Sequence, residues 1–295
     1  MMKKVAALAC TLAVCGATGA MAASVNTMSN VVFIVDESGS MGPEQAFLRD
    51  VVIDKLDADL LGAGVTSRSY GIVGYGGAGG GDPRAVGGTG LSDSATTKAN
   101  LANLVTSGSV EDGYEAIQFA IDTFTFTAGA AVNFILVTDE DRDVAGGPNL
   151  ASIRTAMTSR NILLNAVINN PFTSDNGASS EVIGMDSDGT AYLADGLGSF
   201  TTDTGATIGN GVGNTEVDYA ALALATGGAA WNLNILRDGG NSALSFGEAF
   251  VDIKVSEIVT QQPTPPIPLP AGVWLMISGL GALGVARRAR KAKAA

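Results

Sequence analysis

Residues 31–41 read Val-Val-Phe-Ile-Val-Asp-Glu-Ser-Gly-Ser-Met, an apolar run that passes directly into Asp36, Ser38 and Ser40. An unbroken apolar run of this length predicts a strand buried on both faces, as in parallel sheets. Such a strand delivers its last residues to the carboxyl edge, where α/β folds bind ligands. Carboxylate and hydroxyl oxygens suit a hard divalent cation. The alternative is a helix start in which Ser38 or Ser40 is the N-cap before Pro43, but this explains only one serine.

The chain around this segment alternates between apolar runs and helical spacing, as a doubly wound sheet requires. A second apolar run, 134–138, also ends in an acid, Asp139. With 295 residues and 46% hydrophobic composition, the chain can bury one substantial core. We therefore expect a single α/β domain over 28–259, with a mostly parallel sheet flanked by helices. The further expected strands are 70–75 and 162–168, and the expected helices are 43–61, 98–105, 114–124 and 149–160.

Residues 169–215 break this alternation, because they are rich in Gly, Asp, Ser, Thr and Asn and are longer than most connections in compact domains. We interpret them as a polar insertion, with a hairpin around Tyr192 and Leu193. Within the insertion, residues 186–189 read Asp-Ser-Asp-Gly. A calcium loop would need a closing glutamate that is absent, so a turn is the simpler interpretation.

The Asp-x-Ser-x-Ser motif at 36–40 resembles that of the von Willebrand factor type A (VWA) domain, and the resemblance covers most of the chain. In that family the motif forms part of a metal-ion-dependent adhesion site. Thr138 and Asp139 look like the family's Thr-Asp-Gly segment, although Glu140 stands where glycine is usual. Residues 219–228 resemble the family's late helix and Thr-Gly-Gly turn, which implies a last strand at 231–235 and a closing helix at 246–259.

The third ligand loop of the family departs from its pattern in this chain. Glu111 stands where a threonine usually contacts the metal, and Asp112 lies beside it. Either acid could instead complement the dipole at a helix N-terminus. The resemblance implies a divalent cation, Mg²⁺ first and Ca²⁺ or Mn²⁺ as alternatives, with ligands drawn from Asp36, Ser38, Ser40, Glu111, Asp112 and Asp139.

The N-terminus, residues 1–22, reads as a secretory signal peptide. Lys3 and Lys4 precede an apolar segment of small residues, and residues 20–22 (Ala-Met-Ala) fit a cleavage site after Ala22. Both cysteines, Cys10 and Cys15, fall inside this segment. The exported form would therefore be stable without disulfides.

The C-terminus combines a Pro-rich linker at 260–270 with an apolar segment and a basic tail at 271–295. This order resembles the PEP-CTERM class of sorting signals, in particular its Val-Pro-Leu-Pro-Ala variant, with Ile267 in place of valine. The resemblance implies an outer-membrane envelope, transient inner-membrane insertion, and cutting by an exosortase-type enzyme at the motif Pro268, Leu269, Pro270 and Ala271. A permanent single-span anchor is the alternative.

The net charge of the chain limits the classes of partner that it can bind. The two terminal signals carry seven of the 17 basic residues and none of the 29 acids, so the region between them has ten basic residues and a net charge of −19. So acidic a surface repels nucleic acid and anionic membrane, and it attracts cations.

Composition also bears on catalysis. The chain contains no histidine, the commonest general base and zinc ligand. We therefore expect a binding module rather than an enzyme, placed at the cell surface, in the outer envelope or in the extracellular matrix, with a protein or an acidic polysaccharide as its partner. A structural matrix component without a specific ligand is the alternative, and a metal-dependent hydrolase is a weaker one.

Overall fold

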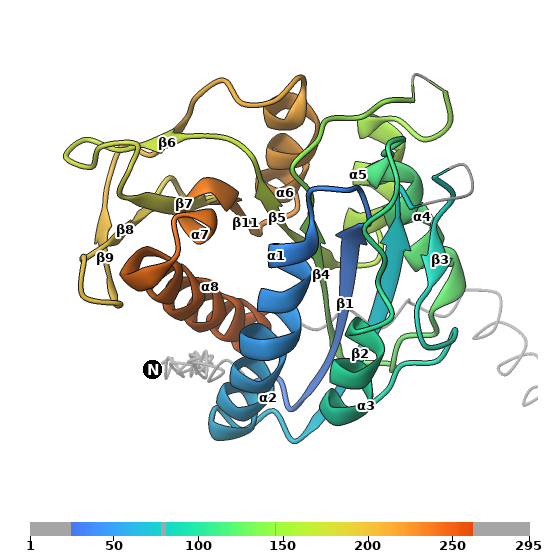
Figure 1. The fold of residues 1–295 in the computed structure, drawn as a ribbon. Coiled ribbons are helices and arrows are strands. Elements are labelled where there is room, and N and C mark those ends of the chain that lie inside the picture. Colours follow the sequence, from blue (N-terminus) through green and yellow to red (C-terminus); the bar gives the residue numbers. More distant parts are fainter. Residues whose placement is uncertain (1–24, 78–80, 145, 262–295) are drawn as a thin grey trace, which may run out of the picture.

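A central sheet of nine strands organises the computed structural model, which describes residues 25–77, 81–144 and 146–261. Its order is β3-β2-β1-β4-β5-β11-β7-β8-β9, and Figure 1 shows it as the middle layer between helices. The parallel part comprises β2 (Ser67–Tyr75), β1 (Met28–Asp36), β4 (Ala131–Val137), β5 (Ile162–Ile168) and β11 (Ala229–Asn232). The predicted doubly wound, mostly parallel α/β fold is confirmed.

Strand β1 is an interior strand of the parallel part, paired with β2 on one side and β4 on the other. Its successive side chains point to opposite faces and are buried on both. Val31, Phe33 and Val35 join the core beneath the helices of one face, and Val32 and Ile34 join the core beneath those of the other. The unbroken apolar run therefore reflects burial on both sides, as predicted.

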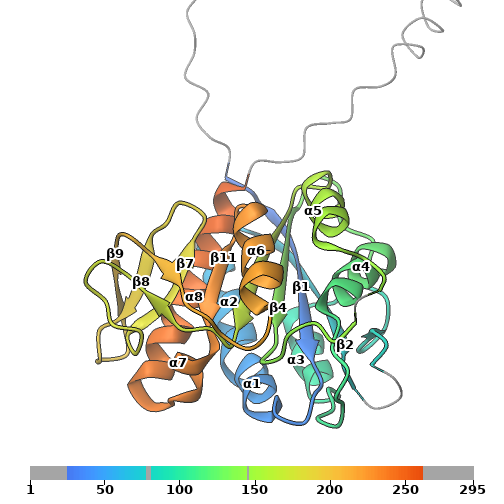
Figure 2. The same cartoon turned by 90° about the horizontal axis from the view of Figure 1, so that it is seen from above.

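Helices cover both faces of the sheet, and Figure 2 shows the two layers from above. One face carries α1 (Gly42–Phe47), the π-helical turn η1 (Leu48–Val52), α2 (Ile53–Gly62), α3 (Ser94–Leu101), α7 (Leu233–Arg237) and α8 (Gly240–Thr260). The other face carries α4 (Gly113–Thr123), α5 (Leu150–Thr158), the π-helical turn η2 (Glu216–Ala220) and α6 (Ala221–Ala225).

Two expected elements are misplaced. The helix expected at 98–105 lies at Ser94–Leu101, because the Asp93 side chain caps its start by accepting from the backbone N–H of Thr96. The last parallel strand was expected at 231–235, but β11 ends at Asn232 and the chain turns at once into α7. The Asn232 side chain accepts a hydrogen bond from the backbone N–H of Asn234 and so caps the helix. A short apolar run does not distinguish strand from helix, and this cap decides between them.

The polar insertion extends the sheet rather than forming a separate lobe. Strand β7 (Val182–Asp186) pairs antiparallel with β11, and β8 (Ala191–Ala194) and β9 (Phe200–Asp203) follow as a meander. The short strands β6 (Phe172–Thr173) and β10 (Thr207–Ile208) pair with each other. At the opposite edge of the sheet, β3 (Arg84–Ala85) pairs antiparallel with β2.

The turn from β7 to β8 is built around Asp186. Its Oδ1 accepts hydrogen bonds from the backbone N–H groups of Asp188 and Thr190, both at 2.9 Å, and its Oδ2 accepts one from the Tyr192 hydroxyl at 2.8 Å. The turn interpretation of residues 186–189 is confirmed. The hairpin expected around Tyr192 and Leu193 turns a few residues earlier, because these two residues lie within β8.

The described chain enters and leaves the domain at the amino edge of the parallel strands. The Asn26 side chain donates to the carbonyl of Ile258 at 2.9 Å and also to that of Gln261. The buried Gln261 side chain accepts a hydrogen bond from Asn133 at 2.7 Å. The domain ends are thus tied together at the pole opposite the carboxyl edge. Within the described residues no helix is both long and apolar enough to cross a membrane. The segments expected at 1–22 and 271–295, and the linker from residue 262 onward, lie outside the described residues.

Substitution of Tyr192 tests whether the insertion is an integral part of the hydrophobic core. It is 3% exposed and stacks on Trp231 with ring centroids 5.5 Å apart. We expect Tyr192→Ala to lower the free energy of unfolding by about 3–5 kcal/mol, the usual cost of deleting a buried aromatic side chain. Urea denaturation followed by circular dichroism measures this. Leu197→Ala, at an 84% exposed position of the same insertion, is the control and should change stability by less than about 0.5 kcal/mol.

Candidate metal site at the carboxyl edge

The candidate ligands converge where the central parallel strands end. Asp36 is the last residue of β1, and Asp139 follows β4, its neighbour in the sheet. The loop before α4 joins them, because the backbone N–H groups of Ser107 and Gly108 donate to the carbonyl of Glu37 at 2.9 and 3.2 Å. Three loops that are distant in sequence therefore meet at one edge of the sheet.

Asp36 lies at the bottom of this site and is fully buried. Its Oδ1 accepts a hydrogen bond from the backbone N–H of Ser38 at 2.6 Å, and its Oδ2 accepts one from the Thr138 hydroxyl at 2.8 Å. Burial raises the pKa of Asp36 to about 6; the bonds from Ser38 and Thr138 oppose this rise, and the nearby Asp139 charge adds to it. Thr138 was not among the expected site residues, although its position before Asp139 in the motif marked it.

The two serine side chains lie above Asp36. Their Oγ atoms are 3.4 Å apart, with Ser38 buried and Ser40 exposed. Neither serine caps the following helix, because the N-cap residue of α1 is Met41 and no side chain caps this end. The helix-start explanation of the motif is therefore wrong, and both hydroxyls remain on the site.

The two adjacent acids of the third loop point to different partners. Both Asp112 oxygens accept from Arg142, Oδ1 from Nε and Oδ2 from Nη2 at 2.8 Å each, and Oδ1 also accepts from the backbone N–H of Tyr114 at 3.0 Å. Asp112 is thus the N-cap of α4, as the dipole alternative supposed. The structure does not bring it to Asp36.

Glu111, in contrast, is turned toward Asp36. A side chain on Gly76, whose φ is +74°, would place its Cβ 3.2 Å from Asp36 Oδ1 and 3.3 Å from Glu111 Oε1. Glu111 Oε1 is buried without a hydrogen-bond partner among the described residues. Burial raises the pKa of Glu111 to about 8, helped by its contact with Asp143 and by the Asp36 charge. A glycine thus leaves room for two carboxylates to face one space.

Only one of the two carboxylate oxygens of Asp139 has a hydrogen-bond partner among the described residues. Its Oδ2 accepts from Arg237 Nη2 at 2.7 Å, while its Oδ1 is buried and, within the described chain, unpartnered. Arg237 lies at the end of α7 and also binds the buried Glu44 of α1. The sequence did not indicate Arg237 or Glu44, because their contact with Asp139 exists only once α1 and α7 pack against the same edge.

The candidate donors at this edge of the sheet are oxygens alone: the carboxylates of Asp36, Glu111 and Asp139, and the hydroxyls of Ser38 and Ser40. Among the described residues, no group of three or more His, Cys, Asp or Glu side chains could by itself hold a metal ion. Any cation here would therefore need the serine hydroxyls as well. Hard divalent cations take such mixed oxygen ligands, and the orphaned oxygens of Glu111 and Asp139 leave two acceptors for one. The residues fit the implied cation.

Neither a family model nor a curated protein matches this chain. Solved structures do match it. An aerotolerance-related membrane protein from Bacteroides fragilis, studied with multiple mutations to serines, is 17% identical over 78% of this chain and 99% of its own, with a TM-score of 0.45. The conserved hypothetical protein BatB from Bacteroides thetaiotaomicron is 19% identical over the same shares, with a TM-score of 0.42. A von Willebrand factor type A structure from Catenulispora acidiphila is 21% identical over 48% of this chain and 33% of its own, with a TM-score of 0.36. Identities this low concern the fold alone.

Proposed function

We propose that this chain is an exported VWA-type binding domain that takes up a divalent cation, Mg²⁺ first, and uses it to hold a partner. The ligands would be Asp36, Ser38, Ser40, Glu111 and Asp139. The observation that carries the proposal is the pair of buried, unpartnered carboxylate oxygens, Glu111 Oε1 and Asp139 Oδ1, beside the buried Asp36. A buried carboxyl oxygen without a hydrogen-bond partner is costly, and a cation would offset that cost.

The residues of the site would have distinct roles. Asp36 orients the Ser38 backbone through its 2.6 Å hydrogen bond, and Thr138 orients Asp36 in turn. The bound cation would supply positive charge and an open coordination position for an oxygen ligand. The exposed Ser40 marks the side from which a partner carboxylate would approach. The lack of histidine supports binding rather than catalysis as the activity.

Export and processing belong to the same proposal. The terminal signals lie outside the described residues, but the structure bears on how the tail is attached. Gln261, the last described residue, is buried and bonded to Asn133, so the folded unit extends to the start of the Pro-rich linker. Because the carboxyl edge lies at the opposite pole, a domain tethered through this linker to the cell envelope would present its metal site outward.

Glu111→Gln and Asp112→Asn form a matched pair that tests which acid holds the cation. We expect saturating Mg²⁺ to stabilise the wild type by about 2.7 kcal/mol at a hundredfold excess over its Kd. Glu111→Gln and Asp36→Ala should lose most of this gain. Asp112→Asn should lower the stability of the cation-free protein, because it weakens the contact with Arg142, but it should keep the gain. Thermal unfolding with and without Mg²⁺ measures all three, and an unchanged gain in Asp36→Ala would refute the site.

The cation-free protein should lose stability as the pH rises. The folded pKa values of Asp36 and Glu111, about 6 and about 8, lie above their ordinary values of 3.8 and 4.5, so the folded state binds these protons more tightly than the unfolded state. The stability they contribute is complete below pH 4 and is lost as the pH rises through 8, by an amount on the order of 1–3 kcal/mol. Urea denaturation in chelator from pH 4 to 9 measures the slope. Glu111→Gln should flatten its upper part, and a slope that rises with pH would contradict the assignment.

Mass spectrometry of the exported protein tests the processing proposal. We expect a mature chain that begins after Ala22 and ends near Pro270. Deletion of 271–295 should misroute the protein without changing its thermal unfolding, because the described domain ends before the linker. An exported chain that still ends at Ala295 would show that the tail is a permanent anchor.

A further inference from the structure

Arg237 presents a free edge beside the candidate site. Its Nε bonds to Glu44, and its Nη2 bonds to Asp139 at 2.7 Å. Its other terminal nitrogen, Nη1, has no hydrogen-bond partner among the described residues, and the side chain is 30% exposed. Two carboxylates from different elements therefore hold the guanidinium in place while one of its N–H edges remains available. A fixed, planar guanidinium is well suited to bind a further carboxylate.

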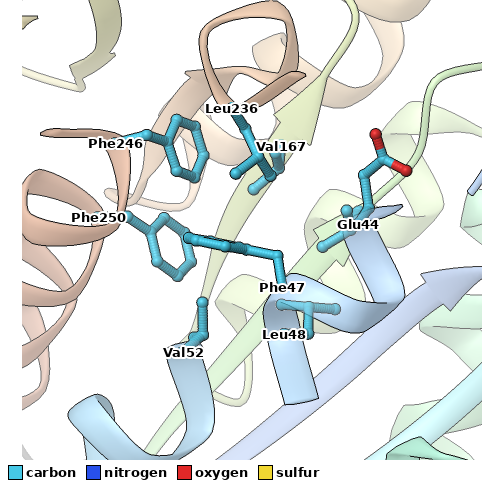
Figure 3. A pocket seen from close by; sticks show the side chains of 9 residues that line it. Glu44, Phe47, Leu48, Val52, Val167, Leu236, Phe246 and Phe250 are labelled. Atoms are coloured by element: carbon cyan, nitrogen blue, oxygen red, sulfur yellow. The ribbon is translucent and has the colours of Figure 1, made fainter. Parts of the chain in front are cut away.

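A cleft of about 500 Å³ opens next to Arg237, between α1 and the α7–α8 junction. Phe47, Leu236 and Ala243 make its walls largely apolar, and Pro43, Glu44, Arg237 and Gly239 complete it. Phe47 also borders a small apolar cavity beneath α1, where it packs edge-on against Phe246 at 6.1 Å. Figure 3 shows these phenyl rings together with Phe250, while the Glu44 carboxylate points away from them. The cleft wall is thus supported by the core.

The apolar surface continues outside the cleft. Leu244, next to Ala243 on α8, is 60% exposed, and Leu197 in the turn between β8 and β9 is 84% exposed. The two elements touch, because a Cβ on Gly198 would lie 3.4 Å from the Leu244 Cβ. The exposed Leu244 thus adds to the apolar surface beside the cleft, and the turn that carries Leu197 lies against it.

We propose that Arg237 and this cleft form the partner-binding side of the cation site, and that the partner is a polypeptide segment with a carboxylate next to an apolar side chain. The inference rests on the proposed function, since the cation and Arg237 Nη1 would share the carboxylate. The domain as a whole is acidic and repels carboxylates, so a partner carboxylate needs local positive charge, which the cation and Arg237 would supply here. An acidic polysaccharide would bring carboxylates but no apolar side chain, and would leave Phe47 and Leu236 in water.

Calorimetry on the full chain tests this in two steps. Mg²⁺ is titrated first, alone. The probe is then an acetylated, amidated pentapeptide with leucine on both sides of one aspartate. Two control peptides replace the leucines by serines or the aspartate by asparagine. An oligogalacturonate is the third control. We expect the leucine–aspartate peptide to bind only with Mg²⁺, and the serine and asparagine peptides and the oligogalacturonate to bind at least about tenfold more weakly.

Variants distinguish a role of Arg237 in peptide recognition from a purely structural role. Arg237→Lys keeps the charge but loses the planar fork, so it should keep Mg²⁺ affinity and weaken the peptide about tenfold. Arg237→Met removes a positive charge beside the cation, so it should bind Mg²⁺ more tightly and the peptide more weakly. A merely structural arginine would weaken both. Ala243→Trp fills the cleft away from the cation ligands and should abolish the preference for leucine over serine, with circular dichroism confirming that each variant is folded.

The outcomes distinguish the two levels of the proposal. No Mg²⁺ binding by the wild type would overturn the proposed function, and this inference with it. Mg²⁺ binding without peptide binding would overturn the inference alone. Tighter binding of the oligogalacturonate, or a leucine preference that survives Ala243→Trp, would show that the partner does not use the cleft.

Discussion

The structure around the site depends on one constraint, the burial of the Asp36 carboxylate at the end of β1, an interior strand of the sheet. Asp36 is fully buried, and its two oxygens are held by the Ser38 backbone and the Thr138 hydroxyl. Because β1 lies between β2 and β4, this carboxylate is surrounded by the loops that follow all three strands. Those loops provide hydrogen bonds and room for the carboxylate: the Ser38 N–H donates to it, and Gly76 lies close to it without a side chain.

Three arginines pair with four of the surrounding acids. Arg84 from β3 pairs with the buried Glu37, Arg142 forks onto Asp112, and Arg237 bridges Asp139 to Glu44. Each arginine comes from a different element, so each ion pair also holds a loop or helix end at the edge of the sheet. Each pair joins a buried carboxylate to an arginine that is at least partly exposed, and pairs of this kind add little net stability.

What the arginines leave unbalanced defines the site. Among the described residues, Asp36 has no arginine partner, Glu111 Oε1 has no partner at all, and Asp139 is bonded through one oxygen only. The same ion pairs therefore leave, among the described residues, carboxyl oxygens without partners at the centre of the site. In a domain of high net negative charge, this is where a cation would relieve most repulsion.

Sequence alone determined the parallel sheet and the place of the site. Apolar runs that end in Asp36 and Asp139 predict strands buried on both faces, and parallel strands bring their carboxyl ends to one edge. The roles of Glu111 and Asp112 stayed open, because adjacent acids before a helix are alike in pattern, and only Arg142 and Gly76 in the folded chain separate them. The antiparallel extension by the insertion, the turn of the chain into α7, and the reach of Arg237 across to Asp139 were also decided by tertiary structure. Each depends on contacts between segments far apart in the chain, and local periodicity carries no record of such contacts.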